Sequence, residues 1–214
     1  MLAEHYARLE HRYRVLEAVF KSDYSRVRTI GYGRLKRTHM LEGMLSTAWQ
    51  TWCAYCALVV WHSVNGTVTK NGANVPSTGQ VSCRGELAYI ANQIKKDQAI
   101  VAGKTVPSNQ EPTWGDPSLL VDLINHTLPA NSNQLKLGLN ISTNAPDHMR
   151  IVRNASAHMS ADNMTRVSKI APYYVGTNVN HPLDLLLWQD TSHQEAVFVA
   201  WIYDLKDMAH AMVL

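Results

Sequence analysis

The chain has 214 residues, of which 46% are hydrophobic, enough for one domain with a substantial core. A formal net charge of +3 is too small to identify a nucleic-acid-binding protein, although ten histidines add positive charge in mildly acidic solution. No stretch approaches 18 uncharged apolar residues, so we expect no membrane span. The first residues carry charges rather than the apolar run of a signal peptide, and three cysteines do not indicate a disulfide framework. We therefore expect a cytoplasmic protein.

Helical periodicity dominates the N-terminal part of the chain. Residues 3–21 alternate charged and apolar side chains and predict an amphipathic helix. Residues 22–33 are a basic connector with two glycines, so the segment 1–34 can be peripheral to the domain. A long helix is expected over 35–64, and its second half is apolar nearly all round, which is typical of a buried central helix.

The remainder alternates loops and helices. Residues 65–82 are rich in Gly, Asn, Thr and Ser, and the Asn71-Gly72 pair is typical of a small β-hairpin. Further helices are expected at 84–102, 116–128, 132–139, 146–159, 160–171 and 192–212. The prediction is a single all-α domain over residues 1–214, a helical bundle with a long central helix and irregular loops.

The stretch from His148 to Met159 carries the strongest functional signal. On a helix, one side of it is apolar and consists of Met149, Val152, Ala155, Ser156 and Met159. The other side is polar and consists of Arg150, Arg153, Asn154 and His158, with small Ala157 among them. Two guanidinium groups, an amide and an imidazole on one face suit a phosphate.

The segment from Arg153 to His158 has the form Arg-Asn-x-x-x-His. It resembles the signature of the HEPN superfamily (higher eukaryotes and prokaryotes nucleotide-binding), in which a polar residue follows the arginine and a histidine comes five to seven positions after it. The resemblance covers roughly residues 35–210 and includes the helical context and the long early helix. It implies a HEPN-like bundle and a metal-independent endoribonuclease without a cofactor. It also implies a homodimer whose two motifs meet at one cleft.

The chemistry of these residues agrees with RNA cleavage through the 2′-hydroxyl, which needs a base, an acid and cations on the phosphoryl oxygens. Imidazole exchanges protons near neutral pH, so His158 can act as base or acid. Arg153 can bind the phosphoryl oxygens, Asn154 can orient the imidazole or bind an oxygen, and Arg150 can hold a neighbouring phosphate. Arg153 and His158 lie about 140° apart around a straight helix, a gap that a second copy closes better than one chain.

The expected role is a toxin or anti-phage defence effector that cuts RNA, with tRNA as a candidate substrate and an antitoxin or regulatory protein as a candidate partner. Two alternatives stay open. The polar face can be an ordinary solvated surface, and a HEPN-like domain can be a non-catalytic module that binds a protein partner or a nucleotide.

Other candidates are weaker. Cys53 and Cys56 form a C-x-x-C in the most apolar helix, where core packing is favoured over zinc. Trp114 lies in a loop and can stack on a base or pack against the loop. A basic run can contact an RNA backbone or be a solvated connector, and consists of Arg26, Arg28, Arg34, Lys36 and Arg37.

Overall fold

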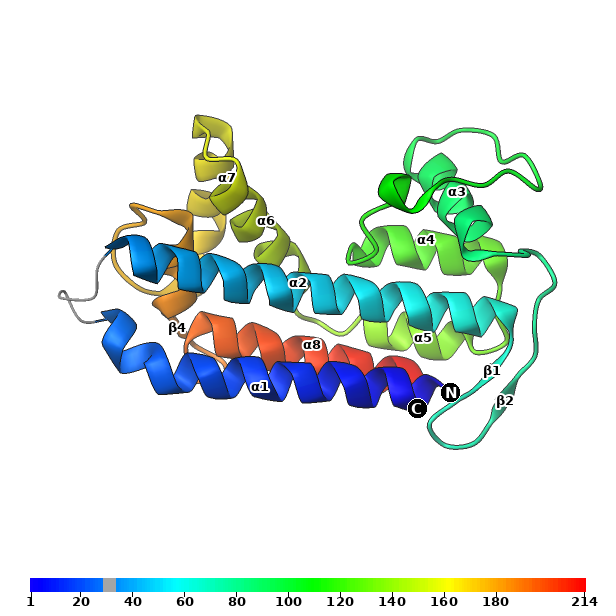
Figure 1. The fold of residues 1–214 in the computed structure, drawn as a ribbon, viewed down its shortest axis with the longest axis horizontal. Coiled ribbons are helices and arrows are strands. Elements are labelled where there is room, and N and C mark those ends of the chain that lie inside the picture. The colour runs from blue at the N-terminus through cyan, green and yellow to red at the C-terminus, as the bar shows by residue number, and fades with distance from the viewer. Residues whose placement is uncertain (29–33) are drawn as a thin grey trace. The chain divides into compact units, whose positions relative to one another are not determined.

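A computed structural model describes residues 1–28 and 34–214, and these residues are predominantly helical (Figure 1). The α-helices are α1 (Leu2–Arg28), α2 (Arg34–Asn65), α3 (Arg84–Lys95), α4 (Pro117–Thr127), α5 (Ser132–Leu139), α6 (Ala145–Ala157), α7 (Ala161–Ile170) and α8 (Val197–Val213). The 3-10 helices are η1 (Ser108–Gln110), η2 (Ala171–Tyr173) and η3 (Pro182–Leu187). The strands are β1 (Thr67–Val68), β2 (Asn74–Val75), β3 (Tyr174–Val175) and β4 (Gln189–Asp190). The predicted all-α class is confirmed.

Within the described ranges, no helix combines the length and the apolar character needed to cross a membrane. The described residues divide into two compact units. The first unit comprises residues 1–9, 52–142 and 207–214, and the second comprises 10–51 and 143–206. The helices α1, α2 and α8 contribute residues to both units.

The first unit buries the second half of α2, as its apolar sequence predicted. Trp52 is fully buried, and its indole N–H donates to the carbonyl oxygen of Gly115 at 3.1 Å. Helix α5 lies unusually close to the end of α8. A Cβ added to Gly138 would lie 2.5 Å from Cγ of Met212 and 2.7 Å from the carbonyl oxygen of Met208, so this contact requires glycine.

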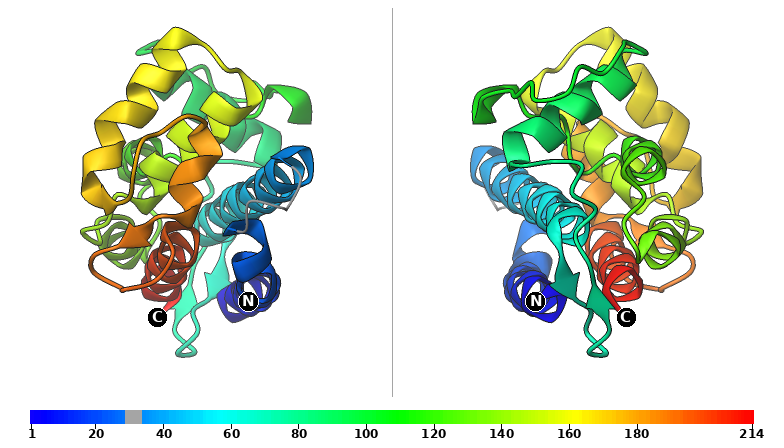
Figure 2. Two further views of the ribbon diagram at one scale, coloured as in Figure 1. Left: turned by 90° about the vertical axis from the view of Figure 1, so that its left-hand side faces the viewer. Right: turned by 90° about the vertical axis from the view of Figure 1, so that its right-hand side faces the viewer.

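The predicted hairpin is present in the same unit. Strands β1 and β2 pair antiparallel, with Thr67 opposite Val75, and Figure 2 shows them as a narrow two-stranded arm. Gly72 has φ of +85° in the turn, a conformation that glycine adopts without strain.

Helix α3 ends at Lys95, seven residues earlier than the predicted end at 102. Asp97 adopts a left-handed conformation with φ of 51°, and the Gln98 N–H donates to the carbonyl oxygen of Gln93 at 3.0 Å. This is the 6→1 bond of a helix C-terminal cap, which aspartate tolerates and which periodicity does not reveal.

The second unit contains α6 and α7, the β3–β4 pair and the first residues of α8. Helix α6 packs against α7 and η3. Tyr13 is fully buried and donates its hydroxyl to the carbonyl oxygen of Ala48 at 3.1 Å. Helix α8 begins at Val197, later than the predicted 192, because the preceding residues turn back onto β4 and the Asp190 N–H donates to the carbonyl oxygen of Glu195 at 2.8 Å.

The N-terminal helix is longer than predicted. Helix α1 continues through the first part of the expected connector to Arg28, because no glycine or proline interrupts the sequence before Gly31. Residues 29–33 lie outside the described residues. Of the predicted basic run, Lys36 and Arg37 lie in the first turn of α2. The structure does not describe the side chains of the other three residues of this run, Arg26, Arg28 and Arg34.

Candidate functional site

The predicted motif lies on α6. The helix begins at Ala145, whose N–H donates to the hydroxyl of Thr143 at 3.1 Å, and Pro146 occupies its first turn. Asn144 stands at the N-cap position, but its side chain makes no capping bond. The hydroxyl of Thr143, rather than the side chain of Asn144, therefore accepts the first N–H of the helix.

Helix α6 ends at Ala157, two residues before the predicted end. His158 leaves the helical conformation, with φ of −137° and ψ of 73°. The hydroxyl of Ser160 accepts the Asn163 N–H at 3.2 Å and caps α7, while the Asn163 side-chain amide donates to the carbonyl oxygen of His158 at 2.6 Å. Side chains of this type favour a turn and a new helix over continuation of the old one.

The apolar side of α6 is buried where the helix persists. Met149, Val152 and Ala155 have no exposed surface, as predicted. Ser156 is half-buried. The prediction for Met159 is wrong, because it lies beyond the end of the helix and 60% of its surface is exposed.

The polar side holds two separate arginine contacts. A guanidinium nitrogen of Arg153 donates to the side-chain oxygen of Asn154 at 3.1 Å, and both side chains are half-buried. Arg150 instead pairs with Asp147 at 2.8 Å. Arg150 therefore shares the helix with Arg153, but its charge is directed to a carboxylate.

His158 is exposed at the end of this face. Its N–H donates to the carbonyl oxygen of Asn154 at 2.9 Å, which keeps its backbone on the last turn. Within the part of the chain that the structure describes, its imidazole makes no hydrogen bond. The structure thus brings Arg153 and Asn154 into contact and leaves the His158 ring open to solvent and to a ligand.

A histidine within α6, His148, was not assigned a role from the sequence. His148 is 6% exposed, and its Nδ1 lies 2.6 Å from the hydroxyl oxygen of Tyr174, which also accepts the Trp201 indole N–H at 2.8 Å. Burial lowers the pKa of His148 and raises the pKa of Tyr174. Because the hydroxyl oxygen already accepts from Trp201, its own proton is available to neutral Nδ1. These three residues form a buried polar contact between α6, β3 and α8.

A carboxylate–imidazole pair supports the start of α6. Asp204 accepts from the hydroxyl of Thr143 at 2.5 Å and lies 2.9 Å from Nε2 of His193. The Thr143 proton is directed to the carboxylate rather than to the imidazole, so the hydroxyl is not activated as a nucleophile. The same hydroxyl accepts the N–H that opens α6, which indicates a structural role.

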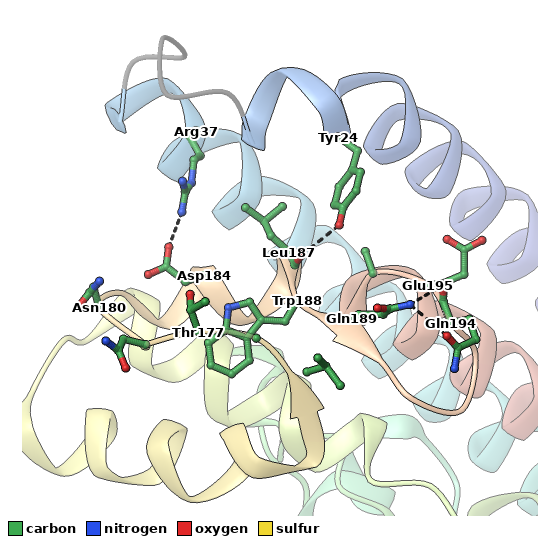
Figure 3. Close-up of a pocket in the computed structure, with 14 residues that line it drawn as sticks. Tyr24, Arg37, Thr177, Asn180, Asp184, Leu187, Trp188, Gln189, Gln194 and Glu195 are labelled. Atoms are coloured by element: carbon green, nitrogen blue, oxygen red, sulfur yellow. Dashed lines mark hydrogen bonds and ion pairs between the residues drawn. The ribbon is translucent and has the colours of Figure 1, made fainter.

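A pocket of about 680 Å³ lies in the second unit, between the end of α1, the start of α2 and residues 175–196 (Figure 3). Its charged side chains are already paired. Arg37 bonds Asp184, and Glu195 accepts from Lys21 at 3.1 Å. The indole of Trp188 lies among these polar groups. Sequence patterns could not predict this pocket, because its walls come from segments more than 100 residues apart.

Cysteine and metal chemistry have little support in the described residues. Cys56 is fully buried and burial raises the pKa of its thiol, while Cys53 is half-buried on the same helix. Trp114 is also buried, and its indole N–H donates to Glu111 at 2.7 Å, so it packs within its loop. Residues 1–28 and 34–214 contain no cluster of three or more His, Cys, Asp or Glu side chains able to hold a metal ion.

Comparison of the chain with models of protein families, with curated proteins and with solved structures found no match.

Proposed function

We propose that this protein is a metal-independent endoribonuclease that cleaves RNA through its own 2′-hydroxyl at the Arg153–His158 face. The observation that carries the proposal is the end of α6. There Arg153 donates to the side-chain oxygen of Asn154 at 3.1 Å. His158 directly follows the helix, its N–H donates to the carbonyl oxygen of Asn154, and its exposed imidazole makes no hydrogen bond with the described residues. A guanidinium can bind the oxygens of a phosphodiester, and an exposed imidazole can transfer a proton to or from it.

The proposed reaction assigns one role to each group. An imidazole removes the proton of the 2′-hydroxyl, whose oxygen attacks the adjacent phosphorus. Arg153 donates hydrogen bonds to the phosphoryl oxygens as negative charge increases on them. The 5′-oxygen leaves and takes a proton from an imidazolium. The products are a 2′,3′-cyclic phosphate and a 5′-hydroxyl, and no outside reactant is consumed.

Two copies of the chain supply the base and the acid. A single His158 would have to serve both steps from one position, whereas two motifs across a two-fold axis place an imidazole on each side of the phosphate. In this arrangement Met159, which is 60% exposed directly after His158, would be buried against the second copy. Arg150 would bind a neighbouring phosphate only if its ion pair with Asp147 breaks.

The test is cleavage of total RNA by the purified protein in EDTA. The proposal predicts cleavage that survives chelation and falls by at least a hundredfold in His158→Ala and in Arg153→Ala, the scale of a lost general base or oxyanion ligand. His126→Ala and Arg12→Ala are the matched controls, because both residues are exposed and lie outside the motif. Full activity in His158→Ala, or cleavage that requires a metal, would overturn the mechanism.

The same variants separate this function from that of a non-catalytic helical module. If the protein only binds a partner or a nucleotide, Arg153→Ala weakens association while no cleavage is detected with the unmodified protein. A nuclease effector, in contrast, arrests growth when overproduced, and its His158→Ala variant does not. Growth arrest that depends on His158 would support a role as a toxin or defence effector that cuts cellular RNA, with tRNA as the candidate substrate.

A further inference from the structure

The pocket beside Trp188 is separate from the groups that the proposed reaction uses. Its volume of about 680 Å³ lies in the range of small-molecule sites. The lining comes from α1, α2, β3, η3 and β4, with Trp188 and the loop after β3 as its floor and rim (Figure 3). A ligand there would meet an aromatic ring and several amides rather than a metal or a nucleophile.

The indole ring of Trp188 is held in place by the backbone. A Cβ added to Gly176 would lie 1.9 Å from Cδ2 of the indole, so the glycine backbone lies directly against the ring. The Trp188 N–H and carbonyl oxygen are bonded to Leu185 and Val197 at 3.1 and 2.8 Å. A ring fixed in this way is pre-organised for stacking, since a ligand need not order it.

The lining offers neutral hydrogen-bonding groups. The Trp188 indole N–H makes no bond with any described residue and is not buried. Thr177, Asn178 and Asn180 are exposed at the rim, and their side chains make no hydrogen bonds with the described residues. Together these groups supply hydrogen-bond donors and acceptors in the same pocket as the indole.

The fixed charges of the pocket cancel one another. Arg37 is committed to Asp184, and Glu195 to Lys21. A strongly charged ligand would have to break one of these pairs, whereas a neutral polar ring would not. Aromatic stacking combined with amide hydrogen bonds is the usual way in which proteins hold an unstacked nucleobase.

Helix α7 connects this pocket to the motif along the chain. It begins three residues after His158, and η2 and β3 follow its end and lead to Val175 in the pocket wall. Its ten residues span about 15 Å. Arg166 and Lys169 are exposed on it and can contact phosphates of a strand that covers this distance.

We propose that the Trp188 pocket binds one unpaired nucleobase of single-stranded RNA. The identity of the strand rests on the proposed function, whereas the chemistry of the pocket, an indole with neutral amides, does not. The pocket would thus hold the strand at one nucleotide while the phosphodiester several nucleotides away lies at His158.

The test measures binding with ligands that cannot be cut. The unmodified full-length protein is titrated by fluorescence anisotropy with 2′-O-methyl octanucleotides, which lack the attacking hydroxyl. One octanucleotide carries all of its bases, and a second of equal charge lacks them. We expect the dissociation constant to rise about 5- to 100-fold without bases, the range of one lost stack. Adenosine monophosphate is a third probe.

Variants of the protein assign this effect to the pocket. Trp188→Leu should raise the dissociation constant for the first octanucleotide by the same factor and leave the second unchanged, while Trp188→Phe, which keeps an aromatic face, should stay within about threefold. Trp61→Leu is the matched control, since Trp61 is half-buried on α2 and outside the pocket. If Trp188→Leu does not fold, the double variant Asn178→Ala and Asn180→Ala replaces it, with exposed Asn71→Ala as control.

Equal binding of the two octanucleotides, or no effect of the pocket variants, would overturn the inference even if the protein cuts RNA. Binding of adenosine monophosphate with no binding of either octanucleotide would overturn the assignment to an RNA strand and leave a free nucleotide as the ligand. Base-dependent binding that Trp188→Leu abolishes would support the inference even if the protein cuts no RNA. The two proposals therefore fail separately.

Discussion

The side-chain amide of Asn163 donates a hydrogen bond of 2.6 Å to the carbonyl oxygen of His158. This bond joins the first turn of α7 to the residue that follows α6. The hydroxyl of Ser160 caps the same turn, because it accepts the backbone N–H of Asn163. The position of the His158 backbone therefore depends on α7 as well as on α6. In the proposed enzyme, Asn163 is a positioning residue.

Asn163→Asp keeps the size of the side chain but removes the donor. The lost bond is worth about 1 kcal/mol, so we expect roughly a fivefold lower kcat for RNA cleavage with little change in KM. Thr165→Ala is the control, because it removes the Thr165 hydroxyl bond to the carbonyl oxygen of Ala161 on the same helix without contacting His158. Steady-state kinetics on a defined RNA measure both variants. An equal loss in the two would mean that helix stability, rather than the position of His158, is responsible.

Two methionines ten residues apart should behave oppositely. Met149→Ala removes a side chain with no exposed surface and should lower the free energy of unfolding by about 2–5 kcal/mol. Met159→Ala, at 60% exposure, should leave the stability of a single copy within about 0.5 kcal/mol and weaken association between copies. Urea unfolding and analytical ultracentrifugation provide the two readings. A Met159→Ala protein that associates as strongly as the unmodified protein would argue against an interface at the motif.

Two helical glycines give a matched pair of substitutions. Gly138→Ala places a Cβ 2.5 Å from Cγ of Met212 and should destabilise the protein by about 1–3 kcal/mol. Gly43→Ala meets nothing within 4 Å in α2 and should stabilise it by roughly 0.5–1 kcal/mol, because alanine favours the helix. Thermal unfolding should move Tm in opposite directions. A similar Tm for both variants would contradict the close approach of α5 and α8.

Buried histidines should make the protein less stable in mild acid. Burial and the neighbouring His62 lower the pKa of His5 to about 4, and burial also lowers the pKa values of His62 and His148. Between that value and about 6.5, the unfolded chain binds more protons than the folded one, so the free energy of unfolding falls as the pH decreases.

The share of His5 in this loss should be about 1 kcal/mol between pH 7.5 and 5, discounted for its partial exposure. Urea unfolding at the two pH values measures it, and His5→Gln should show a smaller difference than the unmodified protein. His11→Gln, on the exposed side of α1, should show the same difference between the two pH values as the unmodified protein. An unfolding free energy that is independent of pH over this interval would contradict the lowered pKa values.

Local sequence signals predicted much of the fold. Residues 132–139 form α5 as expected, Pro146 marks the start of α6, and Gly72 marks the hairpin turn. These features depend on residues that are close in the sequence, so hydrophobic periodicity and turn-forming residues predict them. The exit of His158 from the helix was missed, because it depends on a side-chain bond from Asn163.

The candidate site was predictable only in part. The Arg-Asn-x-x-x-His spacing placed Arg153 and His158 on one polar face, but it could not show that Arg150 pairs with Asp147 or that Asn154 bonds Arg153. The Trp188 pocket was beyond such reasoning. Its walls meet only after residues of α1 and α2 fold against a segment near the C-terminus, and no local pattern encodes that meeting.

The most direct measurement is the chemistry of the ends left on a short RNA cut in EDTA. An RNA in which every nucleotide has a 2′-hydroxyl is compared with one that carries a single 2′-deoxynucleotide at the cut site, and the fragments are weighed by mass spectrometry. The proposed mechanism predicts a 2′,3′-cyclic phosphate and a 5′-hydroxyl from the first RNA, no cut at the deoxynucleotide in the second, and neither product with His158→Ala. A 5′-phosphate end, or equal cleavage at the deoxynucleotide, would contradict it.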